Sequence, residues 1–427
     1  MLSLPVHPSA AQLITWSIVA LGILGIVTRP AKLPEAVWAA AGAIALVALG
    51  LIPLNDVLAA AARGTDVYLF LVGMMLLAEL GRREGLFEWL AAYALRHAQG
   101  SARRLFLLVY AVGTLVTVFL SNDATAVVLT PAVCASARRA QVPALPYLFA
   151  CAFIANAASF VLPISNPANL VVFGEQMPLL GSWLAGFGLA SLASVVVTYL
   201  VLRLTLRRSL TAPLAPPTAA PPLSLPGRIA AGTIVLSALG LLLAAACGWP
   251  LGPMEFVLGA AACGLICLIE RRSPVPLLGH IAWSVLPLVA GLFVLVQATE
   301  NTGALAPLVN WLSRYGAVAP RETAALSAGS VALASNAINN LPMGLVAATV
   351  ARSAHASAQL LGAILIGVDL GPNLSITGSL ATILWLIAIR REGEHVGFLG
   401  FLGIGVWVMP ASLVAALLTF LFGGLTS

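Results

Sequence analysis

Two clusters of helix-breaking and amide-bearing residues could do chemistry in this chain, one in each half. The first half holds Ser121-Asn122-Asp123, then Asn156, then Pro163-Ile164-Ser165-Asn166-Pro167, and the second half holds Asn339-Asn340-Leu341-Pro342, then Asp369, then Gly371-Pro372-Asn373 and Thr377-Gly378-Ser379. Asn122 and Asn339 are 217 positions apart, and Asn156 and Asp369 are 213 apart. These near-equal offsets predict a duplicated unit. Interrupted apolar segments in matching positions of two halves are typical of secondary transporters, which bind solute near the bilayer midplane.

Two carboxylates lie inside these clusters. Of the four aspartates, Asp123 and Asp369 fall in the interruptions, whereas Asp56 and Asp66 fall in or beside a loop. A charged side chain at the centre of a membrane helix costs at least about 2.5–3.5 kcal/mol, so such residues are functional candidates. We therefore expect Asp123 and Asp369 to exchange protons. The alternative for Asp123 is that it only caps the helix that follows.

The neutral polar residues of the clusters are the expected solute ligands. They are Ser121, Asn122, Asn166, Asn336, Asn339, Asn340, Asn373, Thr377 and Ser379. The residues expected to break the helices are Pro163, Pro167, Pro342, Gly371, Pro372 and Gly378. No basic residue lies within either tip cluster, which favours a neutral polyol-like or cationic ligand over a dicarboxylate. The alternative is that some amides only satisfy backbone carbonyls freed by the prolines.

Composition sets the class of protein that must position these residues. The chain is 60% hydrophobic and 8% charged, against about 25% charged residues in a soluble domain. Apolar runs of about 20 residues recur throughout, so we predict an all-α polytopic membrane protein. The net charge of +6 comes from cations at the ends of apolar runs, where they set topology, so nucleic-acid binding is not expected.

The sequence offers no support for an enzyme. It contains no phosphate-binding loop, no His-Glu-x-x-His and no nucleophile elbow. Its five cysteines match neither a disulfide framework nor a zinc site. We expect no cofactor and no metal site.

The expected organisation is two inverted repeats of about ten spanning helices in all, with two re-entrant hairpins and two broken helices. The first repeat covers 1–206, with a hairpin at 102–137 and a broken helix at 145–175. A Pro-rich linker follows at 207–228, and the second repeat covers 229–427, with a hairpin at 321–352 and a broken helix at 356–390. A single broken span is the other reading of 102–137. Arginines concentrate on one side of this arrangement, which predicts that this side and the linker are cytoplasmic and that both termini are periplasmic.

Three segments resemble the arsenite efflux permeases. Phe119–Pro131 is similar to that family's "ND…LTP" tip, Asn339-Asn340-Leu341-Pro342 to its "NNMP" tip, and Asp369–Trp385 to its "DLGP…GSLATLLW" segment. The resemblance covers nearly the whole chain and extends to the wider ion transporter superfamily, which includes dicarboxylate carriers and sodium/proton antiporters. It implies export of trivalent arsenic and antimony across the bacterial inner membrane, driven by proton entry. It also implies a soluble arsenite-stimulated ATPase subunit as a partner of some members. Asn156 stands where the family's "ADTAS" segment has an acid.

The resulting expectation is that Asn122, Asn339 and Asn340 bind arsenous acid or antimonite through hydrogen bonds, without a counter-charge. A sodium/proton antiporter, a carboxylate carrier and a passive metalloid channel remain as alternatives. An intramembrane enzyme is a weaker one.

Overall fold

The computed structural model describes residues 9–215 and 222–423, and within these ranges the regular secondary structure is entirely helical. The first half contains α1 (Ala10–Thr28), α2 (Glu35–Ala48), α3 (Leu54–Arg63), α4 (Thr65–Arg83), α5 (Leu86–His97), α6 (Ala102–Phe119), α7 (Asn122–Ala124), α8 (Thr130–Arg139), α9 (Leu145–Ala157), α10 (Pro167–Phe173) and α11 (Leu180–Thr205). The second half contains α12 (Leu225–Cys247), α13 (Leu251–Glu270), α14 (Val275–Leu278), α15 (Val285–Asn301), α16 (Ala306–Val318), α17 (Pro320–Ile338), α18 (Asn340–Ser353), α19 (Ala358–Leu370), α20 (Leu380–Arg391) and α21 (Phe398–Phe422).

The chain is an all-helical multi-pass membrane protein, which confirms the predicted fold class. Among the described residues, six helices are long and apolar enough to cross a membrane: α1, α6, α11, α12, α13 and α21. The number rises to eight if two bent pairs each count as one span, α3 with α4 at 45° and α15 with α16 at 81°. The predicted count of about ten also includes shorter apolar helices such as α2 and α9.

Helix packing repeats between the two halves. α4 packs against α13 as α15 packs against α2, α6 against α9 as α17 against α19, and α9 against α11 as α19 against α21. A Cβ on Gly73 would lie 2.4 Å from the backbone oxygen of Glu255, and one on Gly291 would lie 2.8 Å from the backbone of Ala39. Small residues let membrane helices approach this closely. Gly73 and Gly291 are 218 positions apart, close to the offsets of the polar clusters.

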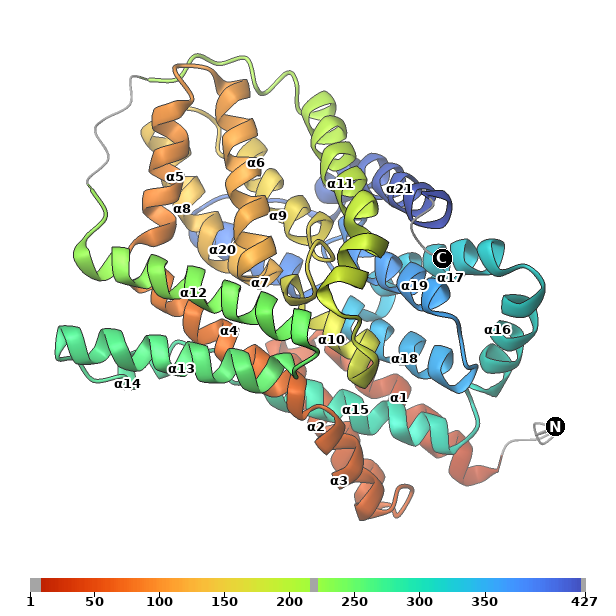
Figure 1. Cartoon of the computed structure of the whole chain (residues 1–427). Coiled ribbons are helices and arrows are strands. Elements are labelled where there is room, and N and C mark those ends of the chain that lie inside the picture. The colour runs from red at the N-terminus through yellow and green to blue at the C-terminus, as the bar shows by residue number, and fades with distance from the viewer. Residues whose placement is uncertain (1–8, 216–221, 424–427) are drawn as a thin grey trace.

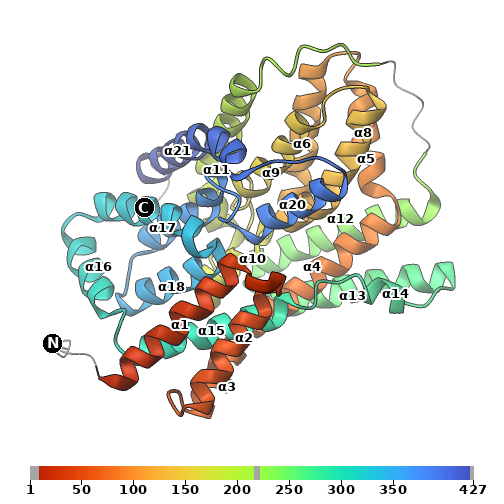
Figure 2. The same cartoon turned by 180° about the vertical axis from the view of Figure 1, so that it is seen from behind.

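Figures 1 and 2 show two layers. α1, α2, α4, α12, α13 and α15 form the lower layer in both views, and the upper layer contains the helices from α5 to α11 and from α16 to α21. α5 lies beside α6 and α8 and buries Phe87, Ala91 and Ala94. This helix therefore packs on the first hairpin through its apolar face.

The first predicted hairpin consists of α6, a break at Leu120-Ser121, α7, a π-helical turn at Thr125–Leu129, and α8. Its two ends lie together, because the backbone N–H groups of Leu214 and Ala215 donate to the carbonyls of Gly100 (3.3 Å) and Ala140 (3.0 Å). Adjacent linker residues therefore contact both ends, which favours a hairpin over a single span. Within the predicted linker 207–228, residues 216–221 lie outside the described ranges, as do the termini whose side of the membrane was predicted.

The second hairpin is formed by α17 and α18, joined at Asn339. Asn339 has φ 74 and ψ 150, a region in which non-glycine residues are strained by about 1–3 kcal/mol and which occurs preferentially at functional sites. Its side-chain oxygen accepts a hydrogen bond from Leu341 N at 3.3 Å, and Asn340 N donates to Gly378 O at 2.8 Å. These two contacts hold the turn in place and join the hairpin tip to the break after α19.

Each predicted broken helix is interrupted in the expected place. α9 ends at Ala157 and α10 begins at Pro167, where the Asn166 side chain accepts from Ala168 N at 3.0 Å. α19 ends at Leu370 and α20 begins at Leu380, where the Ser379 side chain accepts from Thr382 N at 3.1 Å. Both restarts are therefore capped in the standard way, by a side-chain oxygen on a free backbone N–H.

Candidate functional site

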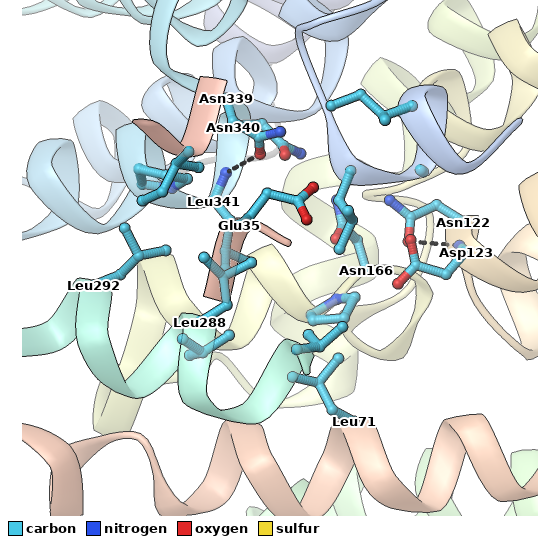
Figure 3. Close-up of a pocket in the computed structure, with 18 of the residues that line it drawn as sticks. Glu35, Leu71, Asn122, Asp123, Asn166, Leu288, Leu292, Asn339, Asn340 and Leu341 are labelled. Carbon is cyan, nitrogen blue, oxygen red and sulfur yellow. Dashed lines mark hydrogen bonds between the residues drawn. The ribbon is translucent and has the colours of Figure 1, made fainter. Parts of the chain in front are cut away.

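One cavity lies where the tips of both hairpins meet the restarts of both broken helices. Its volume accessible to a water-sized molecule is about 50 Å³, within about 690 Å³ of space between side chains that includes open solvent. Polar residues from both halves line it: Asn122, Asp123 and Asn166 from the first, and Asn339, Asn340 and Thr377 from the second. Figure 3 shows Asn122, Asp123 and Asn166 on one side of this space and Asn339 and Asn340 on the other.

Several helix N-termini converge on this cavity, including those of α2 at Glu35 and of α15 at Val285. Its lining includes the first residues of α7, α10, α18 and α20, namely Asn122, Pro167, Asn340 and Leu380. The N-terminal end of a helix carries unpaired N–H groups and a partial positive charge. The cavity can therefore offer hydrogen-bond donors and a favourable field for lone-pair oxygens without a basic side chain.

The two tip asparagines have amide groups available to a solute. Asn122 is 4% exposed and Asn340 is 5% exposed. Asn122 Oδ1 accepts from Asp123 N at 2.9 Å, which leaves its NH₂ group free to donate. No side-chain hydrogen bond joins Asn340 to any other residue in the described ranges. A buried amide pays for desolvation unless it is hydrogen-bonded, so a polar solute or water is the expected partner of both groups.

The two predicted proton-exchanging aspartates have different positions. Asp123 lines the cavity itself. Asp369 is 1% exposed and lies behind the lining, where its Oδ1 accepts from Asn166 Nδ2 at 2.8 Å. Its Oδ2 has no hydrogen-bond partner in the described part of the chain. Asn166 thus connects the second carboxyl to the cavity.

Several predicted solute ligands lie outside the lining and support it instead. Ser121 accepts from Ala124 N at 3.1 Å and caps the first tip. Asn156 Nδ2 donates to Asn373 Oδ1 at 3.0 Å and to Thr382 Oγ1 at 3.3 Å, and it receives a hydrogen bond from Ser379 Oγ on its own Oδ1 at 3.3 Å. This cross-repeat network, consisting of Asn156, Asn373, Ser379 and Thr382, joins the two broken helices.

Asn336 links three further parts of the second half. Its Nδ2 donates to Gly371 O at 2.9 Å, while Ser375 Oγ donates to its Oδ1 at 2.7 Å and Thr377 Oγ1 to its backbone carbonyl at 2.8 Å. Among the predicted helix breakers, Pro167 and Pro342 line the cavity. The remaining breakers form the interruptions themselves: Pro163, Gly371, Pro372 and Gly378.

Sequence reasoning missed one charged residue of the lining, Glu35 at the start of α2. It also missed the apolar wall that α4 and α15 contribute through Leu71, Leu288 and Leu292. An acid at the head of an apolar run looks like an ordinary interfacial residue, so only its position in the fold distinguishes it. Among the described residues, no group of three or more His, Cys, Asp or Glu side chains is placed to hold a metal ion.

Comparisons with known proteins match this chain to membrane transporters. Residues 23–368 match the model of a family described as citrate transporter. The arsenical pump membrane protein of Escherichia coli K12 is 27% identical over 348 residues, covering 77% of this chain and 79% of the relative. An uncharacterized transporter of Mycobacterium tuberculosis is 27% identical over 391 residues, which cover 88% of this chain and 90% of the relative.

Two solved transporter structures share the fold. The YdaH transporter of Alcanivorax borkumensis superposes with a TM-score of 0.57 at 15% identity, over 97% of this chain and 99% of that one. MtrF of Neisseria gonorrhoeae, described as illuminating a class of antimetabolite efflux pumps, superposes with a TM-score of 0.53 at 13% identity, over 98% of this chain and 96% of that one. At these identities the likeness concerns the fold alone.

Proposed function

The chain belongs to the citrate transporter (CitMHS) family and is a multi-pass membrane transporter, and we propose that it exports trivalent arsenic and antimony in exchange for protons. The relatives named arsenical pump membrane proteins support this choice of solute. Arsenous acid is an uncharged triol at neutral pH. Such a solute needs hydrogen-bond donors and acceptors rather than a counter-charge.

The observation that carries the proposal is the single cavity shared by both hairpin tips. Amides from the two halves, Asn122 and Asn340, line it together, and none of its described lining residues is basic. A few convergent polar groups on largely apolar walls are the usual form of a small-molecule site.

A second cavity supports a transport path along the same four helices. It comprises about 1790 Å³ including open solvent, and its lining includes Arg63, Glu300 and Arg352. Four helices line both cavities, and on each of them a residue of the first cavity lies within one helical turn of a residue of the second. The pairs, with the residue of the first cavity given first, are Leu71 and Val67 on α4, Pro167 and Leu170 on α10, Leu292 and Val296 on α15, and Pro342 and Leu345 on α18. One helical turn is about 5.4 Å long, so only a thin apolar layer separates the two spaces. A solute moving between them would cross that layer.

Proton coupling is assigned to Asp123 and Asp369. Asp123 would exchange protons directly with the cavity, and Asp369 through Asn166, to which it is hydrogen-bonded. Each proton that enters across 100 mV contributes about 2.3 kcal/mol, which supports roughly a 50-fold solute gradient.

The membrane orientation follows from the arginine distribution. Several helices end in arginines: Arg29, the pair Arg82-Arg83 and the pair Arg390-Arg391. We propose that these ends lie on the cytoplasmic side of a bacterial inner membrane and that both termini are periplasmic. A soluble arsenite-stimulated ATPase subunit is proposed as an optional partner on that side.

The test is arsenite uptake into everted membrane vesicles, in which the cytoplasmic face is outermost. We expect respiration-driven uptake that an uncoupler abolishes. Uptake that is equal with and without the uncoupler would instead indicate a passive channel.

A carboxylate carrier is the second candidate, because the matching family is described as citrate transporter. It predicts uptake of citrate or succinate by the same vesicles. A sodium/proton antiporter on this fold would instead show sodium-dependent proton flux without any metalloid.

A further inference from the structure

Glu35 lines the candidate site from the opposite layer of the molecule. It is the first residue of α2, in the lower layer of Figures 1 and 2, whereas the tip asparagines belong to the upper layer. In Figure 3 its carboxylate reaches into the cavity, between the Asn339-Asn340 tip and Asn166. The side chain is 16% exposed and forms an ion pair with Arg29.

The charge of the cavity depends on this residue. Of the described residues in its lining, Glu35 and Asp123 carry a formal charge, and both are acidic. Arg29 pairs with Glu35 from the turn after α1 and is not part of the lining. The lining itself therefore presents an acidic side chain on each side of the cavity, while the positive charge that offsets Glu35 lies outside the lining.

The fold itself does not require an acid at this position. α2 begins at Glu35 after Pro34, and α13 begins at Leu251 after Pro250. These two starts are 216 positions apart, so they are counterparts in the repeat, and Leu251 lines the second cavity as Glu35 lines the first. An acid stabilises a helix N-terminus, and the equivalent helix, which starts with leucine, receives one from α4, because Gly252 N donates to Asp66 Oδ1 at 3.0 Å. Glu35 differs in that its carboxylate belongs to the helix itself and reaches into the tip cavity.

We propose that Glu35 is a specificity-determining residue, which together with Asp123 admits neutral or cationic solutes to the tip cavity and excludes carboxylate anions such as citrate. The proposal rests on the proposed function in one respect, since it assumes that the tip cavity is the solute site. It narrows the solute class within a family whose description names an anion. Specificity can be built by placing like charges against the unwanted partner as well as by contacts to the wanted one, and like-charge juxtaposition suppresses wrong partners.

The test measures the charge of the cavity directly, without any substrate. Val27, a half-buried lining residue on α1, is changed to cysteine in a background that lacks the accessible cysteines Cys247 and Cys267. Purified protein in detergent is then treated with a cationic or an anionic methanethiosulfonate of similar size. In detergent the reagents reach both faces, so the result does not depend on membrane orientation.

We expect the cationic reagent to react faster than the anionic one. Glu35→Gln should lower the ratio of the two rate constants about fivefold, which corresponds to about 1 kcal/mol. Arg29→Gln should change the ratio in the opposite direction, because it leaves the carboxylate unpaired. Glu270→Gln is the control, since Glu270 is the last residue of α13 in the lower layer and pairs with an arginine, Arg272, but does not line the cavity.

The proposal would be overturned if the ratio of the cationic to the anionic rate constant were the same in Glu35→Gln and in the control. It would also be overturned if the anionic reagent reacted faster in the Val27→Cys protein that retains Glu35 and Arg29. If Glu35→Gln is poorly folded, the opposite shift expected of Arg29→Gln tests the proposal independently. If the labelling ratios follow the prediction while vesicles carry no arsenite, the metalloid assignment fails and the charge selectivity stands.

Discussion

Asn166 Nδ2 donates a 2.8 Å hydrogen bond to Asp369 Oδ1, and this contact joins the two halves of the chain at the candidate site. Asn166 lines the cavity, whereas Asp369 is buried behind it. The bond therefore gives the buried carboxyl a single-residue link to the solute space. A carboxyl that gains or loses a proton changes what it can offer Asn166, because the protonated form can also donate.

Asp369→Asn should abolish uptake driven by a pH gradient while the protein still inserts in the membrane. Asparagine keeps a side-chain oxygen that can accept from Asn166, so the local structure is retained, but it cannot bind and release a proton. The measurement is arsenite uptake into everted vesicles, with membrane insertion checked by immunoblot.

Asp56→Asn is the control for this substitution. Asp56 lies on α3 outside the cavity, where its Oδ2 accepts from Asn301 Nδ2 at 3.0 Å. It should transport at the wild-type rate. Wild-type, uncoupler-sensitive uptake by Asp369→Asn would remove Asp369 from the coupling mechanism.

Gly371→Ala should destabilise the protein by about 1–3 kcal/mol, the usual cost of overpacking. A Cβ at this break would lie 2.4 Å from the carbonyl oxygen of Ala332 on α17, so the hairpin arm and the broken helix would have to separate. The measurement is the thermal unfolding midpoint in detergent.

Gly329→Ala provides the comparison on the same hairpin arm. A Cβ there meets nothing within 4 Å, and alanine favours a helix over glycine. Its unfolding midpoint should be at or above the wild-type value. Equal midpoints for the two variants would contradict the close packing of α17 on the break.

Asn156→Ala should lower stability more than it lowers solute affinity. The substitution removes the hydrogen bonds to Asn373 and Thr382. The buried Asn373 Oδ1 then lacks its donor, which costs about 1–3 kcal/mol, whereas Thr382 Oγ1 keeps its contact with Ser379 Oγ at 2.8 Å. The unfolding midpoint and the arsenite KM are measured together, with a fall in the first and a small change in the second expected.

Ser412→Ala controls for the loss of a buried polar side chain. The Ser412 hydroxyl donates to Val408 O within its own helix, at 2.9 Å, so its removal should cost less. If Asn156→Ala raises KM as much as Asn340→Ala does while leaving the midpoint unchanged, Asn156 is a ligand and not part of a structural network.

The helices could be predicted from the sequence because their breaks carry strong local signals. Pro167 after Asn166 and Pro342 after Asn339-Asn340 mark helix starts, since proline suits the first turn and asparagine the cap. The structure begins α10 at Pro167 and α18 at Asn340.

The division of the polar residues between lining and support could not be read from the sequence. Asn340 and Asn373 have the same side chain and both follow helix breaks, yet Asn340 lines the cavity and Asn373 bonds to Asn156 and to Phe153 O. Which way each amide faces depends on the contact between the two halves. That contact is a long-range property that no local pattern contains, and Glu35 was missed for the same reason.

The most direct test of the shared site is a double-substitution cycle of Asn122→Ala and Asn340→Ala, read out as the KM for arsenite in liposomes that contain the purified protein and a pH gradient. If one solute touches both hairpin tips, the two effects on binding free energy should deviate from additivity by about 0.5–3 kcal/mol. Effects that add to within about 0.3–0.5 kcal/mol would contradict a common site, and so would unchanged KM values in both single variants.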